Sequence, residues 1–182
     1  MSTELTIAEA GVVAEELLSP LGDRWLHTQA VAARAVELSL AVAEDERELL
    51  VVAAWCHDLG YAPALHVTGM HQLDGARFLA GQGYPQRLCA LVAHHSAATF
   101  EAEERGLLAE LNEWPREESP LADALWAADM TTGPAGERLG YPHRLDEILD
   151  RYAPESAVAR AMTRARPLVE AAIARTMGRL PT

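Results

Sequence analysis

Five of the seven histidines in the chain stand at or beside the ends of predicted helices, and two aspartates accompany them. The residues in question are His27, His57, Asp58, His71, His94, His95 and Asp129. Each of these histidines ends or begins an apolar helical stripe, and helix ends on one side of a bundle can converge on one pocket. Imidazoles and carboxylates without thiolates suit divalent transition metals such as Fe, Mn, Ni, Co or Zn. The residue types therefore predict a metal site.

The doublet His57-Asp58 stands at the predicted C-terminal end of a helix, and Gly60 follows two residues after Asp58 as a stop signal. Neighbouring residues on a helix point about 100° apart, so both side chains reach one ion only from a last turn whose backbone can relax. A carboxylate has two oxygens and can bridge two ions, whereas an imidazole binds one. A second ion would need further ligands, and the candidates are His71 and His94.

Taken singly, these residues have simpler explanations. A histidine at a helix end is more often a cap or a core residue, because its cation interacts favourably with a helix C-terminus. Cys56 and Cys89 lie in apolar helical stretches and are interpreted as small core residues. The order and the spacing of the histidines and aspartates, taken together, favour the metal site.

The elements that would position these residues are all helices, because no segment shows the alternation of a half-buried strand. Helices are predicted over about residues 5–18, 25–43, 45–59, 71–81, 85–95, 101–113, 120–130, 143–151 and 154–177. The third is apolar on every side and is expected to be the central, buried helix. We expect an all-α bundle of about seven to nine helices in a single domain over residues 1–182.

Composition narrows the classes of partner. A net charge of −12 without a basic run argues against a nucleic-acid polymer as partner. No apolar run reaches the roughly 18 residues of a membrane helix, and the acidic N-terminus lacks the basic region of a secretory signal. We therefore expect a cytoplasmic protein with a small anionic substrate and no membrane partner. The oligomeric state stays open, a homodimer being one option.

The order of the metal-binding candidates resembles the HD superfamily of metal-dependent phosphohydrolases over about residues 20–135. The residues that carry the resemblance are His27 in LHTQAVA, His57-Asp58 in WCHDLGY, His71 in GMHQLDGARFL, His94-His95 in LVAHHS and Asp129 in ALWAADMTTG. The resemblance implies an HD-domain bundle, with C-terminal helices over 143–177 following the motif-bearing part. It also implies a first metal on His27, His57, Asp58 and Asp129, and in two-metal members a bridging Asp58.

The resemblance also implies which residues act on the substrate. The metal ligands are then His27, His57, Asp58, His71, His94 and Asp129, of which Asp58, His71 and His94 take part directly in catalysis. For the histidine pair, the stripe formed by Leu88, Leu91 and Val92 slightly favours His95 as the ligand, whereas the resemblance favours His94. We expect His94 to be the ligand and His95 to line the pocket as a substrate contact.

Three further residues are candidates for substrate binding: His66, Arg34 and Arg77. His66 lies in a Pro/Gly loop close before His71, and the two arginines follow His27 and His71 along their helices, where a guanidinium suits phosphate. The simpler explanation is solvated surface side chains. The chain departs from many HD members at Tyr61, where they carry a lysine, so that contact to phosphate is missing.

Two metals about 3.5–4 Å apart can generate a hydroxide at neutral pH and neutralise charge on a phosphoryl group. The leading hypothesis is therefore hydrolysis of a phosphate ester or anhydride in a nucleotide or other small metabolite. A di-iron oxygenase that cleaves a C–C or C–P bond is the alternative, because the same six ligands would serve it. A non-catalytic, ligand-binding HD module is the third.

Overall fold

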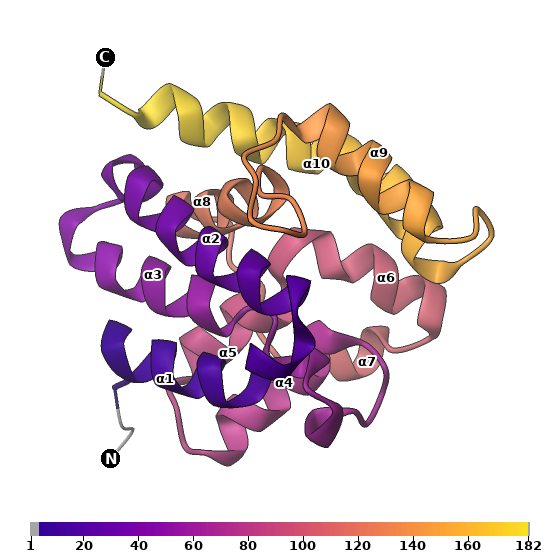
Figure 1. The fold of residues 1–182 in the computed structure, drawn as a ribbon, viewed down its shortest axis with the longest axis horizontal. Helices are drawn as coiled ribbons and strands as arrows, with labels where there is room; N and C mark the ends of the chain where they lie inside the picture. Colours follow the sequence, from indigo (N-terminus) through magenta and orange to yellow (C-terminus); the bar gives the residue numbers. More distant parts are fainter. Residues whose placement is uncertain (1–3, 182) are drawn as a thin grey trace.

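A computed structural model of the protein describes residues 4–181, and the regular elements in that range are helical. The ten α-helices are α1 (Ile7–Leu18), α2 (Asp23–Leu38), α3 (Arg47–Cys56), α4 (His71–Gly81), α5 (Gln86–Ala93), α6 (Ala98–Arg105), α7 (Leu108–Leu111), α8 (Pro120–Met130), α9 (Tyr141–Arg151) and α10 (Ala157–Arg179) (Figure 1). Six 3₁₀ helices accompany them: Ser19–Leu21, Ser39–Ala41, Glu44–Glu46, Leu59–Tyr61, Pro63–Leu65 and His95–Ala97. One isolated bridge, Thr132 to Arg138, is the β-pairing within this range, which confirms the predicted all-α class.

Side-chain caps fix where several helices begin. Thr6 caps α1: its hydroxyl accepts a hydrogen bond from the N–H of Glu9, while the Glu9 carboxylate accepts one from the N–H of Thr6. The hydroxyls of Ser119 and Ser156 accept in the same way at the starts of α8 and α10. These bonds satisfy N–H groups that have no acceptor within their helix. The cap on α8 helps to set the register of a helix that carries Asp129 near its end.

The segment predicted as one helix over residues 101–113 is two helices. Gly106 takes a left-handed conformation with φ of 72° and ends α6, and the short α7 follows. The third predicted helix also ends earlier than expected, at Cys56, so that His57 and Asp58 lie beyond its regular part. That placement frees the doublet from the 100° separation that a continuous helix would impose.

The predicted central helix is confirmed as α3. Each side chain from Leu50 to Ala54 is buried, and α3 packs against α1, α2, α5 and α8. The largest hydrophobic cluster is built around it, from residues of these helices. The C-terminal end of α3 therefore lies inside the protein, where the ends of neighbouring helices surround it.

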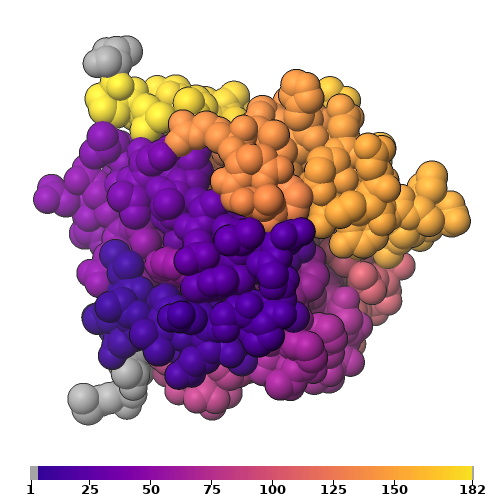
Figure 2. Space-filling view, in the orientation of Figure 1, coloured from indigo at the N-terminus to yellow at the C-terminus, as the bar shows by residue number. Residues whose placement is uncertain are grey.

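Helices α9 and α10 lie together along one side of the molecule (Figure 1). α10 packs on α8 and α6, and a second hydrophobic cluster joins Trp126 and Met130 of α8 to Leu145 of α9 and Val169 of α10. In the space-filling view, the orange segment around residues 131–151 lies against the indigo start of α2 (Figure 2). Within residues 4–181, no helix combines the length and the hydropathy that crossing a membrane requires.

Candidate metal centre

His27, His57 and Asp129 form a first buried group of donor atoms. His27 lies in the second turn of α2, His57 directly follows α3, and Asp129 is the penultimate residue of α8. The Nε2 atom of His27 is 3.1 Å from Oδ1 of Asp129, and that of His57 is 3.9 Å from the same oxygen. The ligand atoms of the group lie within 4.8 Å of one another. They could hold one divalent ion.

Asp58, His71 and His95 form a second group beside the first. His71 is the first residue of α4, and His95 begins the 3₁₀ turn after α5. Their Nε2 atoms are 3.2 Å apart. The ring of Tyr61 stacks on that of His71 with centroids 4.0 Å apart, which fixes the orientation of this imidazole.

Asp58 joins the two groups, because each of its carboxylate oxygens faces a different one. Oδ2 is 3.3 Å from Nε2 of His57 and 3.7 Å from Nε2 of His27. Oδ1 is 3.3 Å from Nε2 of His71 and 4.0 Å from Nε2 of His95. A carboxylate placed in this way can contact two ions at once.

Three of the four imidazoles are oriented by backbone carbonyls. The Nδ1 of His27 donates to the carbonyl of Gly133 at 3.0 Å, and the Nδ1 of His57 donates to that of Ala54 at 2.6 Å. The Nδ1 of His95 donates to the carbonyl of Val92 at 2.7 Å. This pattern leaves the lone pair on Nε2, which is how proteins commonly orient histidines that bind a metal.

The donor set fits a metal ion. The Nε2 atom of His57 is buried and has no hydrogen-bond partner among the described residues, an unfavourable state unless a ligand takes its lone pair. Four imidazoles and two carboxylates without a thiolate suit Fe, Mn, Ni, Co or Zn. The two cysteines, Cys56 and Cys89, are buried elsewhere in the hydrophobic core, as predicted.

The structure places His94 and His95 the other way round from the sequence-based expectation. His95 lies in the second group, whereas the Nε2 of His94 donates to the backbone carbonyl of Trp114 at 2.8 Å. The reason is the helical stripe: His95 continues the buried face of α5, and its ring turns back to the carbonyl of Val92. His94 caps the helix on the other side. His95 therefore occupies the position in the second group that was expected for His94.

Arg24 is a site residue that the sequence analysis missed. Its Nη1 donates to Oδ2 of Asp58 at 2.5 Å, and its guanidinium lies 4.0 Å from the centroid of the Tyr61 ring. Tyr61 stands where many HD members have a lysine, and here it supports an arginine from another helix. The sequence feature that could have identified Arg24 is its spacing from His27, because residues three apart share one face of a helix.

Ser96 is a second residue that was missed. Its hydroxyl donates a short hydrogen bond to Oδ2 of Asp129, the oxygen that does not face His27. Ser96 and Ala97 both have positive φ, 47° and 62°, a conformation that costs a side-chain-bearing residue of order 1–3 kcal/mol. This sharp bend directs His95 towards one group of ligands and Ser96 towards the other.

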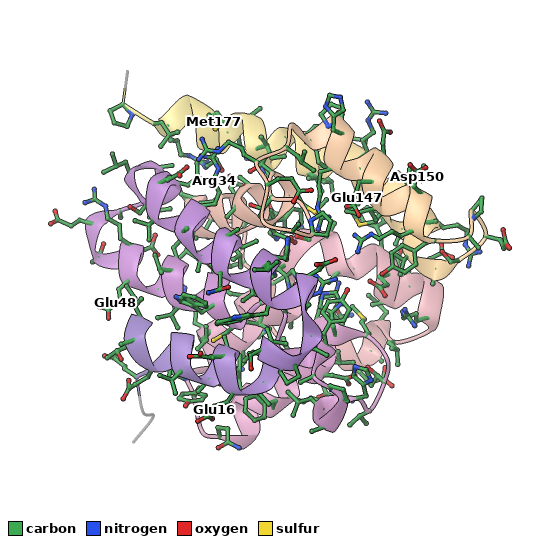
Figure 3. All side chains as sticks on the ribbon, viewed as in Figure 1. Glu16, Arg34, Glu48, Glu147, Asp150 and Met177 are labelled. Atoms are coloured by element: carbon green, nitrogen blue, oxygen red, sulfur yellow. The ribbon has the colours of Figure 1, made fainter. Side chains whose placement is uncertain are left out.

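The three residues proposed for substrate binding besides His95 lie away from the ligands. His66 is exposed, and its Nε2 donates to the carbonyl of Tyr61 at 3.1 Å. Arg34, labelled in Figure 3, donates to Glu37 at 2.6 Å, and its Nε donates to the hydroxyl of Thr131 at 3.5 Å. Neither these two nor Arg77 lines the cavity at the metal centre. His66 is exposed, whereas Arg34 and Arg77 are half-buried but turned away from this cavity, and periodicity alone did not distinguish their positions from the pocket side.

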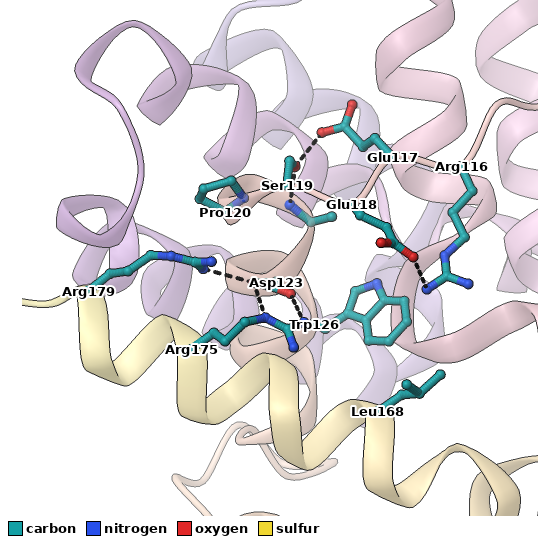
Figure 4. A pocket seen from close by; sticks show the side chains of 11 residues that line it. Arg116, Glu117, Glu118, Ser119, Pro120, Asp123, Trp126, Leu168, Arg175 and Arg179 are labelled. Carbon is teal, nitrogen blue, oxygen red and sulfur yellow. Dashed lines mark hydrogen bonds and ion pairs between the residues drawn. The ribbon is translucent and has the colours of Figure 1, made fainter.

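A cavity of about 60 Å³ adjoins the ligand groups. Its polar lining comprises Arg24, Asp58, Tyr61, His71, Gln72, His95, Ser96, Glu101, Asp129, Arg144, Arg151 and Tyr152, and its apolar lining Met130, Ile148, Val158 and Met162. A wider groove of about 290 Å³ lies elsewhere, between α8 and α10. There the carboxylate of Asp123 is paired with Arg175 and Arg179 (Figure 4). The lining also contains Arg116, Glu117 and Glu118, so its three positive and three negative charges balance.

The surroundings set the protonation states of the ligands. Burial disfavours ionised Asp58, but Arg24 and His57 outweigh burial and hold the pKa of Asp58 well below its usual range. The pKa of Asp129 is also lowered. Burial acts to raise it, but the hydrogen bond with His27 outweighs burial. Burial lowers the pKa of His71 and of His95. Burial also acts to lower the pKa of His57, but the neighbouring Asp58 outweighs burial and raises it. Metal binding requires ionised carboxylates and neutral imidazoles, so an ion at the first group would compete with a proton on His57.

Gly60 allows the second group to form, because the chain after Asp58 passes very close to α4. A Cβ atom at Gly60 would lie 1.9 Å from the carbonyl oxygen of His71 and 2.7 Å from the backbone nitrogen of Gly75. Backbone atoms cannot give way as a flexible side chain can. Glycine at this position therefore brings Asp58 and His71 together.

Replacing Gly60 with alanine is expected to lower the free energy of unfolding by at least about 2 kcal/mol, because the new methyl group collides with the backbone of α4. Urea titration followed by circular dichroism would measure the loss. Gly81→Ala is the matched control, since a Cβ at the end of α4 meets nothing within 4 Å. Equal stability of the two variants would contradict the close contact.

Comparison with protein families gave one match: a family model described as HD domain matches residues 24–132, more than half of the chain. The matched range contains both groups of ligands and ends shortly after Asp129. Comparisons with curated proteins and with solved structures found no significant match.

Proposed function

Because this chain belongs to the HD domain family, we propose that it is a metal-dependent phosphohydrolase acting on a phosphate ester or anhydride of a nucleotide or other small metabolite. The observation that supports this function most is the position of Asp58, with one oxygen towards each group of ligands. In this proposal His27, His57, Asp58 and Asp129 hold one ion, and Asp58, His71 and His95 hold a second.

Two divalent ions bound in this way would polarise a water molecule and neutralise charge on a phosphoryl group. The chain itself supplies the other requirements. Arg24 is held in place by Asp58 and Tyr61, and its remaining N–H groups can donate to phosphate oxygens. Ser96 orients Asp129, and the narrow cavity limits the water that surrounds the reacting group.

Metal loading and phosphate release test this function together. Protein purified without chelator and loaded with Mn²⁺, Fe²⁺, Co²⁺, Ni²⁺ or Zn²⁺ is expected to contain about two equivalents of metal. It should release phosphate from members of a panel of nucleotides and sugar phosphates. Elemental analysis and a colorimetric phosphate assay measure the two quantities.

The same ligands could serve two irons, so the assay includes oxygen uptake by the iron form. Oxygen uptake without phosphate release would contradict hydrolysis and favour an oxygenase that cleaves C–C or C–P bonds. Nucleotide binding without turnover in any metal form would favour a ligand-binding module. Less than half an equivalent of metal after loading would contradict the metal centre itself.

A further inference from the structure

Three arginines separate the cavity at the metal centre from a second pocket. Arg24, Arg144 and Arg151 line both the inner cavity of about 60 Å³ and an outer pocket of about 230 Å³. The outer pocket lies where the segment containing residues 131–151 meets the start of α2 (Figure 2). A molecule that occupies both pockets would lie beside these guanidinium groups.

Arg144 has hydrogen-bonding capacity that the protein leaves unused. The residue is 3% exposed, and its Nη1 donates to Glu147 of the same helix. Its Nε atom is buried and has no hydrogen-bond partner among the described residues. A buried guanidinium donor without an acceptor is unfavourable, so its presence in the lining of a cavity points to an acceptor on a ligand.

The charges around Arg144 are also uneven. Arg151 donates to Glu147 at 2.6 Å, so two guanidinium groups share one carboxylate (Figure 3 shows Glu147 on α9). Neither arginine forms an ion pair with Asp58 or Asp129 in the part of the chain that the structure describes. Among the described residues, Glu147 is therefore the carboxylate with which both arginines form ion pairs, in a protein whose net charge is −12.

The inner cavity, of about 60 Å³, is smaller than the outer pocket, of about 230 Å³. A substrate whose phosphoryl group lies at the ligand groups can extend past Arg144 and Arg151 into the outer pocket. These two residues would then meet a group some distance from the phosphorus under attack.

We propose that Arg144 and Arg151 form a subsite for a second anionic group of the substrate, a proposal that rests on the phosphohydrolase function. The substrate class is then a small molecule with a phosphoryl group and a further phosphate or carboxylate. Both arginines belong to α9, outside the range that the family model matches. The part that the family model matches would carry the reacting groups, and α9 would contribute to substrate specificity.

Binding measurements test the subsite without requiring turnover. Isothermal titration of the metal-loaded protein with inorganic phosphate, pyrophosphate and phosphonoacetate compares one anionic group with two. In Arg144→Gln, affinity for the two-group probes is expected to fall roughly tenfold to a hundredfold, while affinity for phosphate stays within about twofold. The relative losses of pyrophosphate and phosphonoacetate affinity indicate whether the second group is a phosphate or a carboxylate.

Two further variants keep the test valid if Arg144→Gln does not fold. Arg151→Gln changes a more exposed side chain and should lower two-group affinity in the same way, whereas Glu147→Gln frees both arginines and should raise it severalfold. Arg166→Gln, which breaks only a surface ion pair with Glu170, is the control.

An unchanged preference for two-group probes in the folded Arg144, Arg151 and Glu147 variants would overturn the subsite. Arginine-dependent binding without phosphate release from any substrate would overturn the hydrolysis and retain the subsite.

Discussion

Replacing Asp58 with alanine is expected to remove both metals and to reduce phosphate release to background, while the helical circular-dichroism signal persists. The carboxylate of Asp58 faces both groups of ligands, with one oxygen towards each. Without it, two cations would lie close together in a poorly solvated pocket. The guanidinium of Arg24, which now compensates Asp58, would become a third positive charge at the same point. Elemental analysis after metal loading measures the loss.

Asp123→Ala provides the control for this prediction. Asp123 belongs to the same helix as Asp129, but its partners are Arg175 and Arg179 in the groove against α10. Its replacement should leave two equivalents of metal and normal turnover. If Asp58→Ala retains one tightly bound equivalent, then the carboxylate is a ligand of one ion only, and the bridging arrangement is wrong.

Replacing His95 with alanine is expected to lower metal content from about two equivalents to about one and to reduce turnover by more than about a hundredfold. The second group would keep only Asp58 and His71, too few ligands for a stable site. Replacement of residues that merely orient a ligand already costs 10–100-fold, so loss of the ligand should cost more. Metal analysis and steady-state kinetics on the same preparation measure both effects.

His94→Ala is the matched variant, since it changes the adjacent residue of the same type. It should lose the hydrogen bond to the carbonyl of Trp114 and about 1 kcal/mol of stability, but retain both metals. Loss of the second metal in His94→Ala, with retention in His95→Ala, would restore the assignment that the resemblance favoured.

The helices, and most of the side chains that meet at the candidate metal centre, were predictable because both depend on local patterns. Apolar periodicity located α2 and α8, a continuous apolar run located α3, and the order of histidines and aspartates indicated which helix ends would meet. The choice between His94 and His95 shows the limit of a resemblance: the stripe along α5 favoured His95, and the structure agrees with the stripe. A family pattern gives the order of its residues, whereas the helical register decides which neighbour faces inward.

Contacts between distant segments could not be predicted in the same way. The sequence shows Arg24 as one of fifteen basic residues, and nothing local states that it will meet Asp58. Arg144 is more remote still, since α9 reaches the cavity only through the packing of α9 and α10 against α8. Arg34 and Arg77 were expected near the phosphate from helical spacing, but neither lines the cavity at the metal centre. Which groups a long arginine side chain contacts is decided by tertiary packing.

The donor atoms of the metal centre come from residues as far apart as His27 and Asp129, and this spread bears on how the protein matures. A ribosome that has synthesised the chain through α7 has produced the other ligands but not Asp129, nor the α10 helix that packs on α8. The centre can therefore form only once most of the chain has emerged. Ions bound afterwards would act as cross-links between early and late segments, and would favour the folded state by mass action.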